Sequence, residues 1–374
     1  MPGKGKSLIL AGLLASLAAC GAPGSHTAYL TLPTLNSVAA YRINNTSASF
    51  TSIVGSPYLA GGSPGPIALD PSNQFVYVAN RTDNTISLFK VDNTNGSISE
   101  VLPRTSTGLT PGAMVISSGL LFVLNQLSSN ISVYSINSTT GALTEVSGSP
   151  FATFSNPVTL AITPTGKFLY VINSNLGSVF AYTVASSGAL QAISGSPFAA
   201  GAGAFALAVD PGGKFVYVAN SSANTVSIFS INSTSGGLSQ VLGSPYATGT
   251  TPVSVAVYPS GQYLYIANQG TNNITAYSID LSTGIPTAIL NSPFSASGTP
   301  TFLQSDPNGN FIYVFSQTSK TVSAFSVTTP TTAPTSSTAC TPTSESTTCT
   351  LGTLTNSGQD ATLSNLAGAM VVSK

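Results

Sequence analysis

The most regular feature of the chain is an apolar phrase that ends in a polar residue and returns six times. Each copy opens on an aromatic residue or Leu, continues with apolar residues around a central Tyr or Phe, and ends on Asn or Ser. The central aromatics are Tyr77, Phe122, Tyr170, Tyr217, Tyr265 and Tyr313, spaced 45, 48, 47, 48 and 48 residues apart. A sustained period in this range indicates one supersecondary unit repeated along the chain.

Each repeat divides into four short segments with the pattern of β-strands. The unit that starts at Phe205 reads FALAVDP, KFVYVAN, NTVSIFSI and GLSQVLGSP. These segments are rich in Val, Ile, Phe, Tyr and Thr, and they are bounded by Gly, Pro, Asn or Ser. Beyond residue 19, no stretch carries a helical period of useful length. Four antiparallel strands form one blade, and such blades repeated around a ring form a β-propeller.

The two ends of the chain predict a seventh, diverged copy of the repeat and a strand that closes the ring. One step of 48 residues back from Tyr77 reaches Tyr29, in a segment that matches a second strand and has no first strand before it. The segment from Leu366 to Val372 instead resembles a first strand, such as the one at Gly112. The sequence therefore predicts an all-β, seven-bladed β-propeller of four-stranded antiparallel blades over residues 28–374. The C-terminal strand closes the ring and removes its last open edge.

The N-terminal segment has a different character. Residues 1–19 hold Lys4 and Lys6 and then an apolar run, which is too short to span a bilayer and is typical of a secretory signal. Leu17 to Gly21 resembles the bacterial lipoprotein box, which implies lipidation of Cys20 and a lipid-anchored linker over residues 20–27. We therefore expect a protein held in the cell envelope, on the outer membrane or cell surface. A plain signal peptide with an incidental Cys is the alternative.

Composition narrows the possible partners. Only 5% of the residues are charged and the formal net charge is zero, so the surface offers no basic face for nucleic acid. We expect a monomer that meets the membrane through its anchor and binds an unknown protein or glycan. Residues 328–350 form a Thr/Ser/Pro-rich insertion in the last blade, and its Cys340 and Cys349 predict a disulfide in an oxidising compartment. A metal site is a poor rival, because no His lies near.

Few residues suit acid–base chemistry. His26 is the only histidine and is expected to precede the first strand, which excludes His-based catalysis and the usual zinc sites within the propeller. We predict no metal and no cofactor. Asp70, Asp210 and Asp306 each precede Pro between a first and a second strand. They are expected to stabilise those turns through their own backbone, on the face opposite the starts of the first strands.

The repeated phrase, followed by Asn-Thr-Val/Ile-Ser and then by a Gly-x-Leu turn, resembles the YVTN-type repeats of lactonase-like seven-bladed propellers. These are relatives of the bacterial 6-phosphogluconolactonase propeller, so the resemblance implies that fold and a lactone substrate. Hydrolytic members carry His, Arg and Glu around the central channel. The first-strand starts of this chain, such as Pro64-Gly65-Pro66 and Pro252-Val253-Ser254, match none of them. No catalytic residue is therefore carried over.

The ends of the second strands supply the candidate ligand-binding residues. These are the polar residues Asn80, Arg81, Gln126, Asn173, Asn220, Gln269 and Gln317. A second interpretation of the Asn members is that their side chains cap the loops that follow. We favour a non-catalytic module that presents this neutral polar face. The alternative is a lactone hydrolase that works without histidine.

Overall fold

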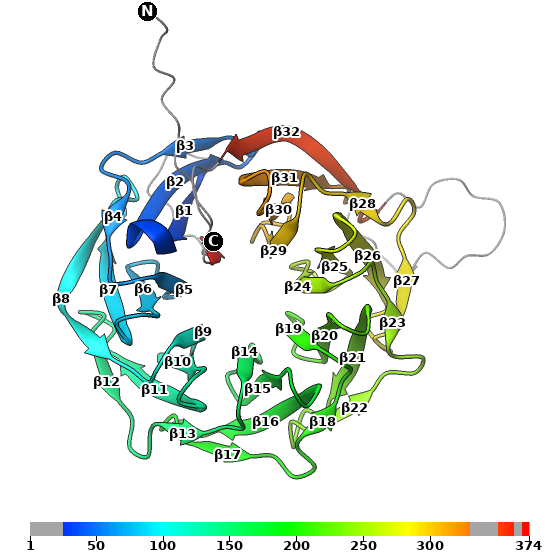
Figure 1. The fold of residues 1–374 in the computed structure, drawn as a ribbon, viewed down its shortest axis with the longest axis horizontal. Coiled ribbons are helices and arrows are strands. Elements are labelled where there is room, and N and C mark those ends of the chain that lie inside the picture. Colours follow the sequence, from blue (N-terminus) through cyan, green and yellow to red (C-terminus); the bar gives the residue numbers. More distant parts are fainter. Residues whose placement is uncertain (1–24, 330–350, 363–368, 374) are drawn as a thin grey trace, which may run out of the picture.

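The computed structural model describes residues 25–329, 351–362 and 369–373 as a ring of seven antiparallel sheets (Figure 1). Within every sheet the strands run outward from the ring axis in a simple up-and-down order, and five of the sheets gain a short extra strand at the outer edge. The only helical element in these ranges is the 3-10 turn η1 (Pro33–Leu35). The predicted fold class and blade count are confirmed.

The strands fall into five sets according to their distance from the axis. The inner strands are β33 (Met370–Val372), β5 (Pro64–Leu69), β9 (Pro111–Ser117), β14 (Pro157–Ile162), β19 (Ala204–Val209), β24 (Pro252–Val257) and β29 (Pro300–Ser305). The second strands are β1 (Ser25–Leu32), β6 (Phe75–Asn80), β10 (Leu120–Asn125), β15 (Phe168–Asn173), β20 (Phe215–Asn220), β25 (Tyr263–Asn268) and β30 (Phe311–Ser316).

The third strands are β2 (Ser37–Asn44), β7 (Thr85–Val91), β11 (Asn130–Ile136), β16 (Ser178–Val184), β21 (Thr225–Ile231), β26 (Asn273–Ile279) and β31 (Thr321–Val327). The outer strands are β3 (Phe50–Ser52), β8 (Ile98–Ser106), β12 (Leu143–Glu145), β17 (Leu190–Ala192), β22 (Leu238–Gln240), β27 (Pro286–Ala288) and β32 (Leu354–Thr362). The short extra strands are β4 (Tyr58–Leu59), β13 (Phe151–Ala152), β18 (Phe198–Ala199), β23 (Tyr246–Ala247) and β28 (Phe294–Ser295).

The ring closes as predicted, with the two ends of the chain in one sheet. The inner strand β33 pairs antiparallel with β1, and Tyr29 lies opposite Val371. The strand β1 begins at Ser25, three residues before the expected start of the propeller. His26 therefore lies inside β1 and is buried, so its expected position ahead of the first strand was wrong.

The second strands form the core of each blade. All six residues of β6, β10, β15, β20, β25 and β30 are buried. Their central tyrosines also link neighbouring blades. The hydroxyl of Tyr77 donates to the carbonyl of Gly141 at 2.7 Å, and that of Tyr170 to Gly236 at 2.8 Å. In each case the acceptor lies in the turn between the third and outer strands of the next blade. The repeated aromatic thus packs the blade and satisfies its own hydroxyl across the interface.

Two faces of the ring follow from the strand directions. We call the face at which the inner strands begin the entry face, and the opposite one the turn face. The turns between first and second strands lie on the turn face, where Asp70 Oδ1 accepts the backbone N–H groups of Gln74 and Phe75 at 2.8 and 2.7 Å. Asp210 repeats this arrangement. The predicted turn-stabilising role of these carboxylates is confirmed.

A buried polar contact joins the first blade to the last on the turn face. The side chains of His26 and Asp306 are each 1% exposed, and His26 Nε2 lies 3.7 Å from Asp306 Oδ1. His26 Nδ1 is 3.1 Å from the carbonyl oxygen of Ser373, and Asn308 Nδ2 is 3.2 Å from Nε2. Because a carbonyl can only accept and an amide nitrogen can only donate, the neutral ring with its proton on Nδ1 fits both partners. Burial lowers the pKa of His26, against the opposing influence of Asp306.

We expect the stability of the ring to fall as the pH drops below about 6.5. The pKa of His26 is lowered in the folded state, so below this pH the unfolded chain takes up a proton that the folded one refuses. Burial raises the pKa of Asp306, which offsets part of the loss at lower pH. Urea unfolding of the wild type and of His26→Asn at pH 7.5 and 5.5 measures the effect. Equal pH slopes for the two proteins would show that His26 is not the cause.

Three predictions concern residues outside the described ranges. These are the signal peptide with Cys20, the insertion at residues 328–350 from residue 330 onward, and the pairing of Cys340 with Cys349. In the described part of the chain, no helix is long and apolar enough to cross a membrane.

Candidate functional site

The entry face is shaped by a β-bulge that recurs in six blades. The pairing of the inner strand with the second strand shifts just after the first residue of the inner strand. In β19, for example, Ala204 pairs with Asn220 and Ala206 with Ala219, so that Phe205 is left unpaired. Bulges re-aim side chains and are frequent beside binding sites. The bulges also set the backbone of the inner rim next to the ends of the second strands.

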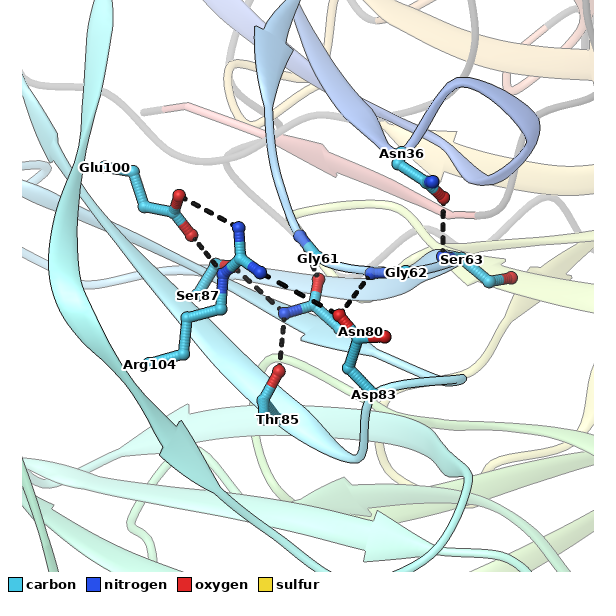
Figure 2. A network of polar contacts seen from close by, with 10 residues as sticks. All are labelled: Asn36, Gly61, Gly62, Ser63, Asn80, Asp83, Thr85, Ser87, Glu100 and Arg104. Atoms are coloured by element: carbon cyan, nitrogen blue, oxygen red, sulfur yellow. Dashed lines mark hydrogen bonds and ion pairs between the residues drawn. The ribbon is translucent and has the colours of Figure 1, made fainter.

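The asparagine that ends a second strand is a buried clamp for the loops of the entry face. Asn80 is fully buried, and its Nδ2 donates to Thr85 Oγ1 and Ser87 Oγ, both at 3.0 Å. Its Oδ1 accepts the backbone N–H of Gly61 at 3.0 Å, in the loop that arrives from the previous blade (Figure 2). A Cβ at Gly61 would lie 2.4 Å from the Asn80 side chain, which explains the glycine.

Similar clamps stand in other blades. The Nδ2 atoms of Asn125, Asn220 and Asn268 each donate to two side chains of the third strand of their own blade. Asn173 departs from the pattern, because its Nδ2 contacts the carbonyl of Ser155 and its Oδ1 accepts from the N–H of Leu176. All five are buried. The loop-capping interpretation therefore describes Asn80 and Asn173, which bond to loop backbone. Asn220 bonds only to its third strand, and its Oδ1 has no partner.

We expect Asn80→Ala to destabilise the blade. The substitution removes three hydrogen bonds and leaves the buried N–H of Gly61 without its acceptor. At about 1–3 kcal/mol for an unsatisfied buried group, the free energy of unfolding should fall by about 2–3 kcal/mol. Urea unfolding measures the change, with Gln317→Ala as the control, because Gln317 is exposed on the same face. A loss below about 0.5 kcal/mol would contradict the clamp.

Arg81 follows the clamp of the second blade and is half-buried over the inner rim. A Cβ at Gly65, the bulge position of β5, would lie 2.5 Å from Arg81 Nε, so the side chain rests against this backbone. The Nε atom is buried and has no hydrogen-bond partner. Burial lowers the pKa of Arg81. Among the described residues the ion pairs involve only His26, Arg104 and their acidic partners, so none neutralises Arg81.

Neighbouring charges explain why Arg81 has no counter-ion. Asp83, two residues further on, accepts the N–H of Gly62 at 2.7 Å and lies 3.8 Å from Arg104 (Figure 2). Arg104 is held in turn by Glu100, through bonds of 2.7 and 3.1 Å to its two carboxylate oxygens. Such bidentate pairs are among the stronger charged contacts. This network fixes the loop that carries Arg81 and commits the carboxylate of Asp83 to other partners.

The predicted glutamines line the same face as Arg81, in three other blades. Gln126 leans over the bulge glycine Gly112, and its Nε2 donates to the carbonyl of Val158 in the next inner strand at 3.3 Å. Gln269 is half-buried and Gln317 is exposed. The ring thus distributes the predicted set around the entry face: the amides and Arg81 are accessible, and the asparagines lie beneath the loops.

Sequence reasoning missed the glycines that make room for these side chains. Gly65 and Gly112 stand at the bulge positions, and each is overlain by the residue that follows the clamp. Pro-Gly at both starts was visible in the sequence, but it reads equally well as a turn. No group of three His, Cys, Asp or Glu side chains suited to a metal ion occurs in the described ranges.

The fold and the entry face together define the class of protein, a seven-bladed propeller on whose entry face Arg81 lies among polar amides. The model of the family described as "Lactonase, 7-bladed beta-propeller" matches residues 22–161 and 152–351, and the chain belongs to this family. A search of curated protein sequences finds no match.

Solved structures agree with this fold. A candidate 6-phosphogluconolactonase from Bacteroides uniformis superposes with a TM-score of 0.75 at 17% identity, covering 92% of this chain and 98% of its own. A second candidate 6-phosphogluconolactonase, from Bacteroides fragilis, gives 0.74 at 19% identity and covers 93% and 97%. A periplasmic gluconolactonase from Pseudomonas aeruginosa gives 0.68 at 18% identity and covers 81% and 92%.

Proposed function

We propose that this protein hydrolyses a lactone on its entry face, with Arg81 as the group that binds the reacting carbonyl. The observation that supports this most is the half-buried guanidinium, whose Nε has no partner and whose charge has no described counter-ion. Because Nε is covered, a ligand oxygen would contact the terminal nitrogens of the guanidinium and supply the partner that its charge lacks. Membership of the lactonase family supports the choice of a lactone over other oxygen ligands.

The reaction needs little from the protein beyond binding and charge stabilisation. Water attacks the lactone carbonyl carbon, negative charge develops on the carbonyl oxygen, and the ring C–O bond then breaks. The attacking water gives one proton to solvent, and the departing ring oxygen takes a proton from solvent to become a hydroxyl. The carboxylic acid that forms then ionises and releases a proton. A preorganised cation beside the carbonyl oxygen stabilises the charged intermediate. The amides of Gln126, Gln269 and Gln317 suit a neutral substrate, because they donate and accept hydrogen bonds without charge.

A direct assay tests the proposal. Lactone opening releases acid, so proton release from neutral and phosphorylated sugar lactones and from alkyl lactones reports turnover by the purified protein. We expect turnover of at least one class above the uncatalysed rate. If no lactone is hydrolysed, the proposal fails.

One observation favours a second candidate, a non-catalytic binding module for a protein or glycan. In the described ranges no carboxylate or imidazole forms an ion pair with Arg81, so the contacts of Arg81 assign no general base to the site. In that case the same face would bind a neutral ligand without turnover. Because there are few charges, binding should vary weakly with salt concentration.

We further propose that the protein is exported and anchored through lipidated Cys20. The sequence of residues 1–21 supports this, as does the position of Ser25, where β1 begins on the turn face. An anchor a few residues before β1 would hold the turn face toward the membrane and leave the entry face open to solvent. Replacing Cys20 by Ser should move the protein from the membrane to the soluble fraction. If the variant stays with the membranes, lipidation of Cys20 is not the attachment.

A further inference from the structure

The entry face carries a group of large apolar side chains that the proposed reaction does not use. Leu109, Leu127, Phe154 and Leu176 are 53%, 73%, 55% and 58% exposed. We call these four residues the apolar crescent. All four lie in loops between strands. Grouped exposed apolar residues mark interaction sites more often than single ones do.

The members of the apolar crescent belong to two adjacent blades, two in each. The backbone N–H of Leu127 donates to the carbonyl of Leu109 at 3.2 Å, so these two residues are neighbours across a blade junction. The ring of Phe154 stacks on Phe180 of β16 at 4.1 Å between centroids. Leu176 belongs to the same blade as Phe180. The blades that contain β9–β12 and β14–β17 stand side by side (Figure 1).

The repeat itself provides a comparison. In the fifth, sixth and seventh blades the same loops are residues 200–203, 221–224, 248–251, 269–272, 296–299 and 317–320. They contain only Ala, Gly, Ser, Thr, Asn, Gln and Lys. The fold therefore does not need large apolar residues in these loops. Exposed large apolar residues in these loops are concentrated in the third and fourth blades, and Leu35 of the first blade, at 36% exposed, is the other described case. This concentration indicates a local purpose.

The apolar crescent is continuous with the loop of Arg81. That loop ends at Asn84, whose Oδ1 accepts the N–H of Thr110 at 2.8 Å and whose carbonyl accepts the N–H of Thr107 at 2.9 Å. Leu109 lies between these two anchored residues. An unpaired cation thus stands at one end of an apolar surface. A molecule that matches both has an oxygen-rich head and an aliphatic chain.

We propose that the substrate is a lactone with an aliphatic chain, whose ring meets Arg81 while the chain lies on the apolar crescent. The inference rests on the proposed function and specifies its substrate class. Apolar burial favours each added methylene by a roughly constant factor, about two- to fourfold in affinity when the group is largely covered. A polar sugar lactone would gain nothing from this surface.

The test is a series of δ-lactones with alkyl side chains of increasing length, measured beside glucono-δ-lactone. For the wild type, KM should fall by about two- to fourfold per added methylene until the crescent is covered. In Leu127→Asn/Leu176→Asn that dependence should vanish, with KM for glucono-δ-lactone unchanged. Leu242→Asn is the matched control, because Leu242 is 82% exposed and lies outside the crescent, after the outer strand β22. It should behave as the wild type.

The outcomes separate this inference from the function on which it rests. Hydrolysis of lactones with no chain-length dependence overturns the inference and leaves the proposed function standing. If no lactone is hydrolysed, the proposed function fails. Calorimetric binding of the ring-opened hydroxyalkanoates then tests whether the apolar crescent binds an aliphatic chain. Chain-length-dependent binding that the double variant loses would support the crescent, and its absence would overturn it. If the wild type forms a dimer and only the double variant does not, the crescent is the contact between two copies of the chain. That result would also overturn the inference.

Discussion

A chain that ends at Gly368 should lose about 3–6 kcal/mol of stability and associate with other copies, because it lacks the strand that closes the ring. In the full chain β33 pairs with β1 from Ala28 to Leu30. Beside this pairing, Thr31 Oγ1 accepts the N–H of Ala369 at 3.0 Å, and Ser373 Oγ accepts the N–H of Thr27 at 3.2 Å. Each such bond contributes about 1 kcal/mol, and the exposed edge of β1 would offer free backbone groups to another chain.

Urea unfolding and size-exclusion chromatography measure both effects. A chain that lacks only Lys374 is the control, since it keeps β33 and the contacts of Ser373. We expect it to elute as a monomer with an unchanged unfolding midpoint. If the longer truncation behaves in the same way, β33 does not hold the ring closed.

Arg81→Ala should lower kcat/KM for the preferred lactone by about 100-fold or more, the effect of removing one donor to a developing oxyanion. The fold should survive, because no described ion pair depends on Arg81 and its side chain lies over the rim instead of within a blade. Arg81→Lys keeps the charge but loses the planar set of donors, so we expect partial activity.

The matched control is Arg42→Ala. Arg42 lies near the turn face, where its guanidinium donates to the carbonyl of Asn95 at 3.2 Å. Its removal should leave the kinetics unchanged. Equal rates for Arg81→Ala and the wild type would remove Arg81 from the reaction and favour the non-catalytic alternative.

The sequence determined the architecture because the same strand and turn pattern recurs in every repeat, so each copy supports the prediction made from the others. The period of about 48 residues, the strand pattern around Tyr77 and its equivalents, and the missing first strand beside Tyr29 predicted the ring and its closure. The structure confirms all of these. The turn role of Asp70 and Asp210 could also be predicted, because a carboxylate before Pro bonds to backbone groups a few residues away. Interactions between residues close in the chain can be recognised from the sequence pattern around them.

Contacts between residues far apart in the chain produce no recognisable sequence pattern, and only the tertiary structure showed them. His26 was expected outside the propeller, yet it is buried against Asp306 and Ser373, about 280 and 347 residues further along the chain. The hydroxyl of Tyr77 finds its acceptor in the next blade. The candidate site shows the same division. Its residues were predicted as one polar set, but the fold buries Asn80 beneath a loop and leaves Arg81 unpaired over Gly65. Burial and pairing depend on what the rest of the ring places beside each side chain.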